Sequence, residues 1–146
     1  CPLIILDEAH HLPPEAFEQL RLLLSSEMDS QSLGALLLVG HPELRNTLRL
    51  SNYQSFAQRI STRFHLGTLD LQSSLAYIQH QLKISGYKGP PLFTDDALHH
   101  IFHYTKGVPR QINLICHLSL MAGMIDRQSV LDIATIRKVI ADLEAN

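Results

Sequence analysis

The chain has 146 residues, 45% of them hydrophobic and 18% charged, and its formal net charge is -2 when histidine is counted as neutral. This composition excludes intrinsic disorder, which combines low hydrophobicity with high net charge, and it provides no overall basic field that would attract nucleic acid. The longest apolar stretch, 33–39, is far shorter than the ~20 residues that a membrane-spanning helix needs.

The length suits one domain or two small ones. The two cysteines, Cys1 and Cys116, form no CxxC motif, so we interpret both as thiols of a reducing compartment and Cys116 as a core residue. The chain opens directly on a strand pattern without an initiator methionine, and we interpret it as part of a longer protein.

The first half of the chain has the pattern of a parallel α/β fold. The apolar runs at 3–6 and 35–39 are typical of strands buried on both faces of a parallel sheet. A helix is predicted between them at about 14–26, which gives a βαβ unit. Residues 43–63 predict further helix, broken near Asn52 and Tyr53, and 64–67 predict a short third strand.

The second half of the chain predicts only helices. Strand patterns disappear after residue 67, and four helical patterns follow, at about 70–85, 94–105, 109–125 and 132–144. We expect two domains, a partial α/β core at 1–67 and an all-helical domain at 68–146.

Two acids follow the first predicted strand, at a place where α/β proteins bind ligands. Asp7 and Glu8 stand at its carboxyl end, the edge at which parallel sheets hold their ligands. Asp7 suits a hydrated Mg²⁺, and Glu8 suits the orientation and deprotonation of an attacking water. The alternative is a strand that ends in solvated acids.

Three further signals follow in chain order. His41 comes after the second strand and should lie at the same sheet edge as the acids. Arg59 and Arg63 are four residues apart, which would place them on one helix face, and arginine suits phosphate recognition. Arg110 follows Pro109 in the first turn of a predicted helix. For each one alone, a solvated surface residue is the alternative.

In this order, these features resemble the AAA+ ATPases, most closely the secretion ATPase A (general secretion pathway protein A) family with its relatives in pilus biogenesis. The likeness covers essentially the whole chain. It rests on the segments LIILDEAHHL, EQLRLLLSSE, LLLVGHPELR, QRISTRFHL, YIQHQLKISGYKGPPLFTDDAL and GVPRQINLIC.

The resemblance implies a role for each candidate residue. These roles are the Walker B pair for Asp7 and Glu8, sensor 1 for His41, arginine-finger candidates for Arg59 and Arg63, and sensor 2 for Arg110. ATP and Mg²⁺ are the implied cofactors. The family usually has glutamine where this chain has His41. The sequence also contains no GxxxxGKS or GxxxxGKT phosphate-binding loop, which in AAA+ proteins precedes Walker B.

The resemblance further implies the carboxyl-terminal part of an ATPase module that forms a homo-oligomer through its nucleotide site. It implies assembly of a secretion or pilus machine at the cytoplasmic face of the bacterial inner membrane. Two alternatives are a DNA-transposition ATPase and a non-catalytic fragment that docks a partner. The first is less favoured, because 95–125 holds only Lys106 and Arg110 as fixed positive charges.

Two other motifs are discounted. Residues 7–10 spell the DEAH of superfamily-2 helicases, but the Ser-Ala-Thr motif that a helicase needs does not follow. His99 and His103 are spaced i, i+4 and could chelate zinc, but no third ligand is indicated, so a solvated histidine face is the better interpretation.

Overall fold

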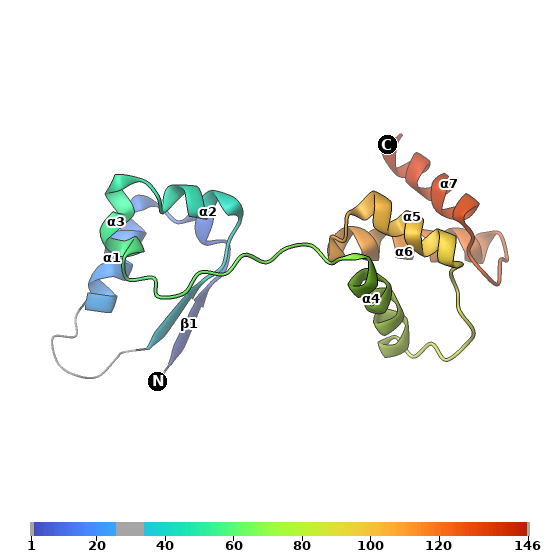
Figure 1. The fold of residues 1–146 in the computed structure, drawn as a ribbon, viewed down its shortest axis with the longest axis horizontal. Helices are drawn as coiled ribbons and strands as arrows, with labels where there is room; N and C mark the ends of the chain where they lie inside the picture. Colours follow the sequence, from blue (N-terminus) through green and yellow to red (C-terminus); the bar gives the residue numbers. More distant parts are fainter. Residues whose placement is uncertain (1, 26–33, 146) are drawn as a thin grey trace. The chain divides into compact units, whose positions relative to one another are not determined.

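The structure is a computed structural model that describes residues 2–25 and 34–145. It divides into two compact units, 1–65 and 66–146 (Figure 1). The predicted boundary near residue 68 lies beside this division.

The first unit contains a parallel pair of strands. Strand β1 (Leu3–Leu6) pairs with β2 (Ala35–Leu38) in parallel, and helix α1 (Pro14–Ser25) lies between them in the sequence. A 3-10 turn, η1 (Ala9–His11), follows β1 directly. Both predicted strands and the predicted helix are therefore confirmed, within a residue at their described ends.

The expected burial of β1 and β2 on both faces is wrong, and Ala35 and Leu37 of β2 are exposed. Leu3 and Ile5 keep 58% and 57% of their surface exposed, and Ile4 is exposed as well. Within the described residues, β1 pairs only with β2, and the buried cluster of the unit has Leu36 and Leu38 of β2 packed against it but no residue of β1. An apolar run predicts that a strand will be covered, but it does not supply the element that covers it.

Aromatic contacts hold the helices of the first unit together. Phe17 on α1 meets Tyr53 and Phe56 edge to face, with ring centroids 5.1 and 5.5 Å apart. These residues come from η2 (Ser51–Tyr53) and α3 (Gln54–Ala57), which follow α2 (Pro42–Thr47). The predicted break near residues 52 and 53 falls between two short helices.

The segment after α3 differs from the prediction. The helix ends at Ala57, and residues 60–70 form no helix or strand, so the third strand expected at 64–67 is wrong. Phe64 and Leu66 are strongly exposed. The sequence FHLG is compatible with a strand, but within the described residues no neighbouring strand pairs with it.

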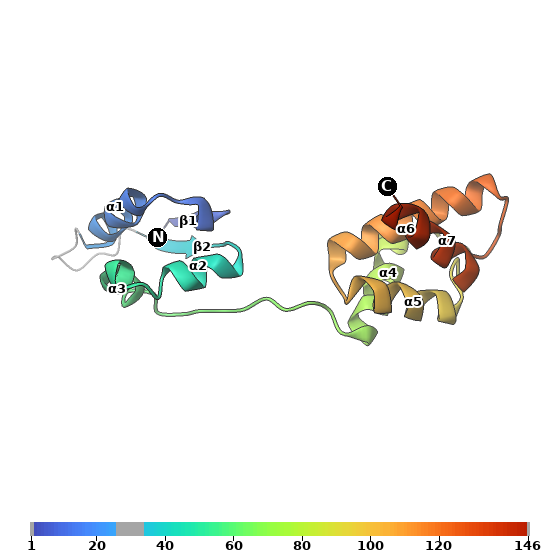
Figure 2. The same cartoon turned by 90° about the horizontal axis from the view of Figure 1, so that it is seen from above.

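The second unit is a helical bundle, seen from two directions in Figures 1 and 2. Its four helices confirm the predicted pattern: α4 (Leu71–Ile84), α5 (Asp95–Thr105), α6 (Pro109–Ile125) and α7 (Ile133–Glu144). Their apolar faces meet in a core whose fully buried members include Ile101, Ile112, Ile115 and Ile136. Cys116 packs against this core, and burial raises the pKa of its thiol to about 12.

Side chains at the N-cap position stabilise the first turn of three of these helices. Asp70, Thr94 and Asp132 each accept a hydrogen bond from a backbone N–H three residues on, at 2.7, 3.3 and 3.0 Å. These bonds satisfy N–H groups that the helix cannot satisfy itself. They also lower the pKa of the Asp70 and Asp132 carboxyls, by stabilising the charged form.

Gly107 fixes the approach of α4 to the turn before α6. It has a φ of 75°, and its carbonyl accepts the backbone N–H of Leu69 at 2.9 Å. A Cβ atom at this position would overlap the Leu69 carbonyl oxygen. Glycine is therefore required both for its backbone conformation and for the close contact.

We predict that Gly107→Ala destabilises the second unit by more than 2 kcal/mol, because left-handed backbone costs about 1–2 kcal/mol for an L-residue and the overlap adds to it. Gly86→Ala is the matched control, since Gly86 also has a positive φ of 87° but has open space where its Cβ would lie. Urea unfolding followed by circular dichroism measures both. Equal losses for the two variants would contradict the packing argument.

Candidate functional site

The acids follow β1 in a strained turn. Glu8 adopts a left-handed conformation, with φ 53° and ψ 31°, and its backbone N–H donates to the Asp7 carboxylate Oδ1 at 2.8 Å. For a residue other than glycine this conformation costs about 1–3 kcal/mol, and such strain gathers at functional sites. Both carboxylates are exposed at the carboxyl end of the strand.

Backbone hydrogen bonds extend the pairing of β1 with β2 into the loops that follow the two strands. Val39 donates to the Leu6 carbonyl at 2.9 Å, and Ala9 donates to the Val39 carbonyl at 2.8 Å. At Gly40, an added Cβ would lie only 3.2 Å from the backbone nitrogen of His10. The loop after β2 therefore lies directly against the turn after β1.

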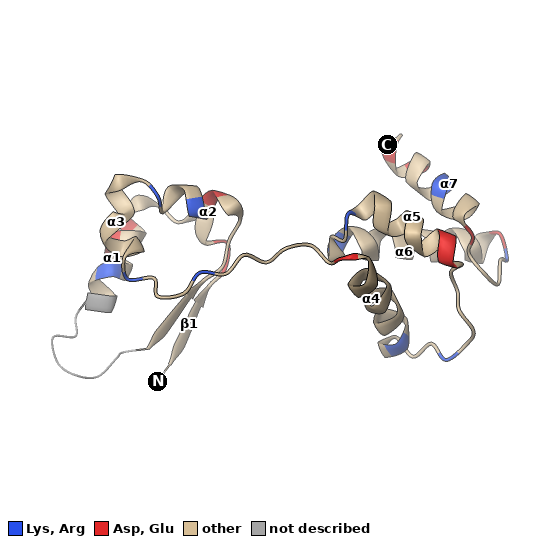
Figure 3. Ribbon diagram, in the orientation of Figure 1, with Lys and Arg blue, Asp and Glu red and all other residues tan. Residues whose placement is uncertain are grey.

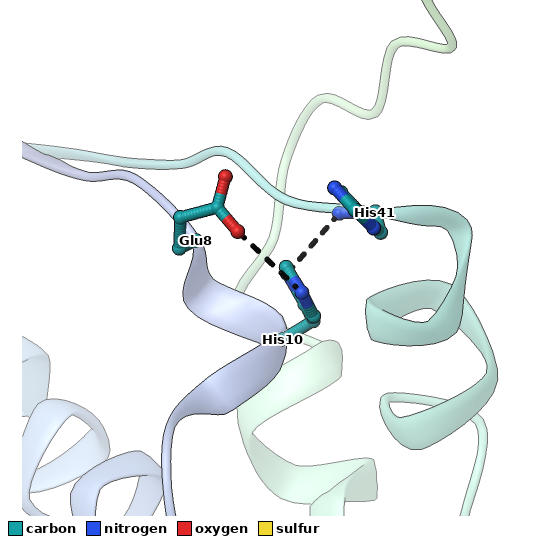
Figure 4. Close-up of side chains that lie close together, drawn as sticks. All are labelled: Glu8, His10 and His41. Carbon is teal, nitrogen blue, oxygen red and sulfur yellow. Dashed lines mark hydrogen bonds and ion pairs between the residues drawn. The ribbon is translucent and has the colours of Figure 1, made fainter. Parts of the chain in front are cut away.

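This contact brings Glu8, His10 and His41 together (Figure 4). The Nε2 atom of His10 lies 3.5 Å from Glu8 Oε2, and its Nδ1 atom accepts the backbone N–H of His41 at 3.4 Å. The two imidazole rings stack with centroids 4.3 Å apart and an angle of 15° between planes. The structure thus places His41 at the sheet edge where the sequence predicted it.

The sequence analysis did not identify His10 as a site residue and considered it only as the last residue of the DEAH motif. The signal was available in part, because His10 stands two residues after Glu8 and His41 directly follows Gly40. The sequence could not show that the two loops pack closely enough for the imidazoles to stack.

Asp7 fits a hydrated magnesium ion. Its carboxylate is exposed at the sheet edge, and Mg²⁺ binds through one or two carboxylates while it keeps several waters. The remaining ligands in such sites are substrate phosphates and water. Asp7 could therefore hold such an ion.

The two arginines do not share a helix face, and that prediction is wrong. Helix α3 ends at Ala57, so the two arginines lie beyond it. Arg63 turns back and donates from Nη2 to the Ala57 carbonyl at 2.9 Å, which satisfies a carbonyl at the helix end. Arg59 is exposed just beyond the helix.

In the second unit, Arg110 occupies the first turn of α6, directly after Pro109. Its side chain is exposed, as predicted for a residue at a helix start. Val108 is the N-cap residue of α6, and Gly107 comes directly before it.

His99 and His103 lie on α5 and are exposed, in agreement with a solvated histidine face. Over residues 2–25 and 34–145, no helix combines the length and apolar character needed to cross a membrane.

Three comparisons with known proteins bear on this chain. A family model described as an AAA domain matches residues 1–48. Over 121 residues, which are 83% of this chain, the sequence is 42% identical to general secretion pathway protein A of Aeromonas hydrophila, and the chain spans 22% of that relative. A solved RuvB mutant of Thermotoga maritima matches with a TM-score of 0.73 and 14% identity, over 99% of this chain and 45% of that one.

The match to the solved structure shows the fold alone, because the identity is low. The sequence match is much closer and extends through both units. By sequence and by fold, the chain belongs to the AAA+ proteins as part of a domain related to general secretion pathway protein A.

Proposed function

We propose that this chain supplies the Walker B and sensor 1 part of the core, together with the helical lid, of an ATP-hydrolysing AAA+ protein. The observation that carries the proposal is the edge where β1 ends. There Asp7 and Glu8 are exposed in a strained turn, and the loop after the neighbouring strand places His41 beside them. This is the edge at which α/β proteins bind phosphorylated ligands.

In this proposal Asp7 holds Mg²⁺ through water, and Glu8 orients and deprotonates the water that attacks the γ-phosphate. His41 lies at the sensor 1 position, where it would contact the γ-phosphate or the attacking water. The geometry supports these roles, because the left-handed turn leaves the Glu8 carboxylate at the surface instead of packing it against the sheet.

The arginines would act on the charge of the triphosphate. We assign Arg59 as the arginine finger, acting in trans on ATP held by a neighbouring subunit. Arg63 anchors the segment, since its guanidinium is engaged by the Ala57 carbonyl. Arg110, at the start of α6, would be the sensor 2 residue that links nucleotide to the lid.

The similarity to general secretion pathway protein A supports a role in a secretion or pilus machine, at the cytoplasmic face of the inner membrane. A DNA-transposition ATPase is the alternative. In the helical unit, lysine and arginine are spread over several elements (Figure 3), and the stretch 95–125 holds only Lys106 and Arg110, which disfavours the DNA-acting alternative. The proposed ATP hydrolysis does not depend on which of these two machines the protein serves.

We predict that the 146-residue chain alone neither hydrolyses ATP nor binds it tightly. It has no glycine-rich loop to supply backbone N–H groups, a lysine and a hydroxyl to the phosphates. Isothermal titration calorimetry with Mg·ATP should show no micromolar binding. A micromolar dissociation constant would mean that other residues of the chain hold the phosphates.

We predict that Glu8→Gln in the full-length protein keeps nucleotide binding and lowers turnover by about 10²-fold or more, because the amide cannot accept a proton. Glu15→Gln is the matched control, since Glu15 is an exposed acid on α1 in the same unit. Steady-state phosphate release measures both. A loss below tenfold, about 1.4 kcal/mol in the barrier, would remove Glu8 from the role of base.

We predict that Arg59→Ala binds ATP but turns it over about 10³-fold more slowly, as expected for a trans arginine that meets charge in the transition state. Arg49→Ala, an exposed arginine in the same unit, is the control. Mixing Arg59→Ala with Glu8→Gln protein should restore part of the activity, because some sites then combine both intact residues. If native mass spectrometry shows mixed oligomers and activity stays absent, Arg59 acts in cis or structurally.

A further inference from the structure

We propose that Glu8, His10 and His41 form a binding site for a divalent transition metal of the Zn²⁺ type, and that this metal competes with ATP hydrolysis for Glu8. The metal site is a property of this chain alone. The competition rests on the proposed function, because it requires Glu8 to be the catalytic base.

The spacing of the ligand atoms suits such an ion. One ligand atom from each residue lies within 4.8 Å of the other two. One pair, Glu8 Oε2 and His10 Nε2, is 3.5 Å apart. Two ligands at about 2.0–2.2 Å from a tetrahedral zinc ion are separated by roughly 3.4 Å. Glu8 Oε2 and His10 Nε2 are therefore already spaced as two ligands of one zinc ion would be.

The donor types distinguish this site from the magnesium position. Two imidazoles and one carboxylate are a known zinc ligand set that leaves the fourth position for water. Mg²⁺ prefers oxygen ligands and keeps its waters, so it has little affinity for imidazole nitrogen. Asp7 and the His10–His41 pair would thus select different ions a few residues apart.

His10 is the fixed member of the site. Its side chain is only 10% exposed, and it follows Ala9, which is fully buried and bonded to the carbonyl of Val39. His10 Nδ1 accepts a hydrogen bond, so in the neutral ring the proton is on Nε2, facing Glu8. A metal would take the place of that proton between His10 and Glu8.

This exchange has a small local cost. With a metal on Nε2, the neutral His10 ring carries its proton on Nδ1 and can no longer accept the backbone N–H of His41. That bond is long, at 3.4 Å, and exposed. Water can therefore replace it for both partners.

His41 is the adaptable member. Its side chain is 63% exposed, and at the N-cap position of α2 it makes no capping bond. In the stacked arrangement the nitrogen lone pairs of the two rings run side by side and do not converge on one point. Rotation of the His41 ring toward Glu8 completes the site, and an exposed side chain rotates without repacking a core.

Metal binding would remove Glu8 from catalysis. A carboxylate that coordinates zinc shares its negative charge with the metal and is held in one orientation, so it becomes a much weaker and misdirected base for the attacking water. The strained turn already holds Glu8 beside His10. Zinc at this position would therefore act as a reversible inhibitor that leaves Asp7 and the lid untouched.

The binding test uses the 146-residue chain with Zn²⁺ in calorimetry and Co²⁺ in visible spectroscopy, both with millimolar Mg²⁺ present. We expect micromolar Zn²⁺ affinity and the intense absorption bands of tetrahedral Co²⁺. His10→Gln and His41→Gln should each weaken Zn²⁺ binding at least tenfold, while circular dichroism confirms that both variants remain folded.

Matched histidine variants control for binding elsewhere. His65→Gln removes an exposed imidazole of the first unit that is not part of the cluster, and the double variant His99→Gln/His103→Gln removes the pair on α5. Neither should change the Zn²⁺ affinity. Equal loss in a control and in His41→Gln, or an absence of binding below millimolar Zn²⁺, would overturn the site.

The competition is tested in the full-length protein as the ratio of ATP turnover with and without micromolar Zn²⁺. We expect strong inhibition of the unaltered protein and a ratio near one for His10→Gln. Inhibition that persists in His10→Gln would overturn the competition and leave the binding result intact. A full-length protein with no ATPase activity would contradict the proposed function, while the titrations of the chain would still decide the metal site.

Discussion

The candidate site depends on the parallel pairing of β1 with β2 and on two backbone hydrogen bonds that extend it past the strands. Val39 donates to the carbonyl of Leu6 at the end of β1, and Ala9 donates to the carbonyl of Val39 just beyond both strands. Because both strands run in one direction, their following loops leave from the same edge. At Gly40 these loops meet closely, because an added Cβ would lie 3.2 Å from the backbone nitrogen of His10 and would push the loops apart by a few tenths of an ångström. The positions of the acids and of both imidazoles follow from this contact.

The helical unit is built mainly by local interactions, which explains why the sequence predicts it well. Capping side chains at residues 70, 94 and 132 mark three helix starts, and Pro109 marks the fourth. Each signal acts within one helical turn, so it can be read without knowledge of the rest of the fold. The apolar spacing on α6 and α7 then determines which faces meet in the core.

Prediction fails where the outcome depends on residues far away in the sequence. The run at 3–6 forms a strand as expected, but its exposure is set by the elements that cover it, which the run itself cannot specify. The segment 58–67 has local patterns for helix and strand, yet it forms neither, since Arg63 ties it to the end of α3 and no strand edge pairs with it in the described residues. The stacking of His10 on His41 spans 31 residues and has no local signal.

The chemistry of the site is then decided by which side chain stands at position 41. Its backbone N–H donates to His10 Nδ1, so the residue at this position lies beside His10. A glutamine amide would offer one oxygen and one donor group to a phosphate or water, and it is a poor ligand for zinc. An imidazole can serve the same phosphate and also bind a soft divalent cation. Under the proposed function, the same backbone would serve a plain phosphate sensor with glutamine at this position and a site that metal can inhibit with His41.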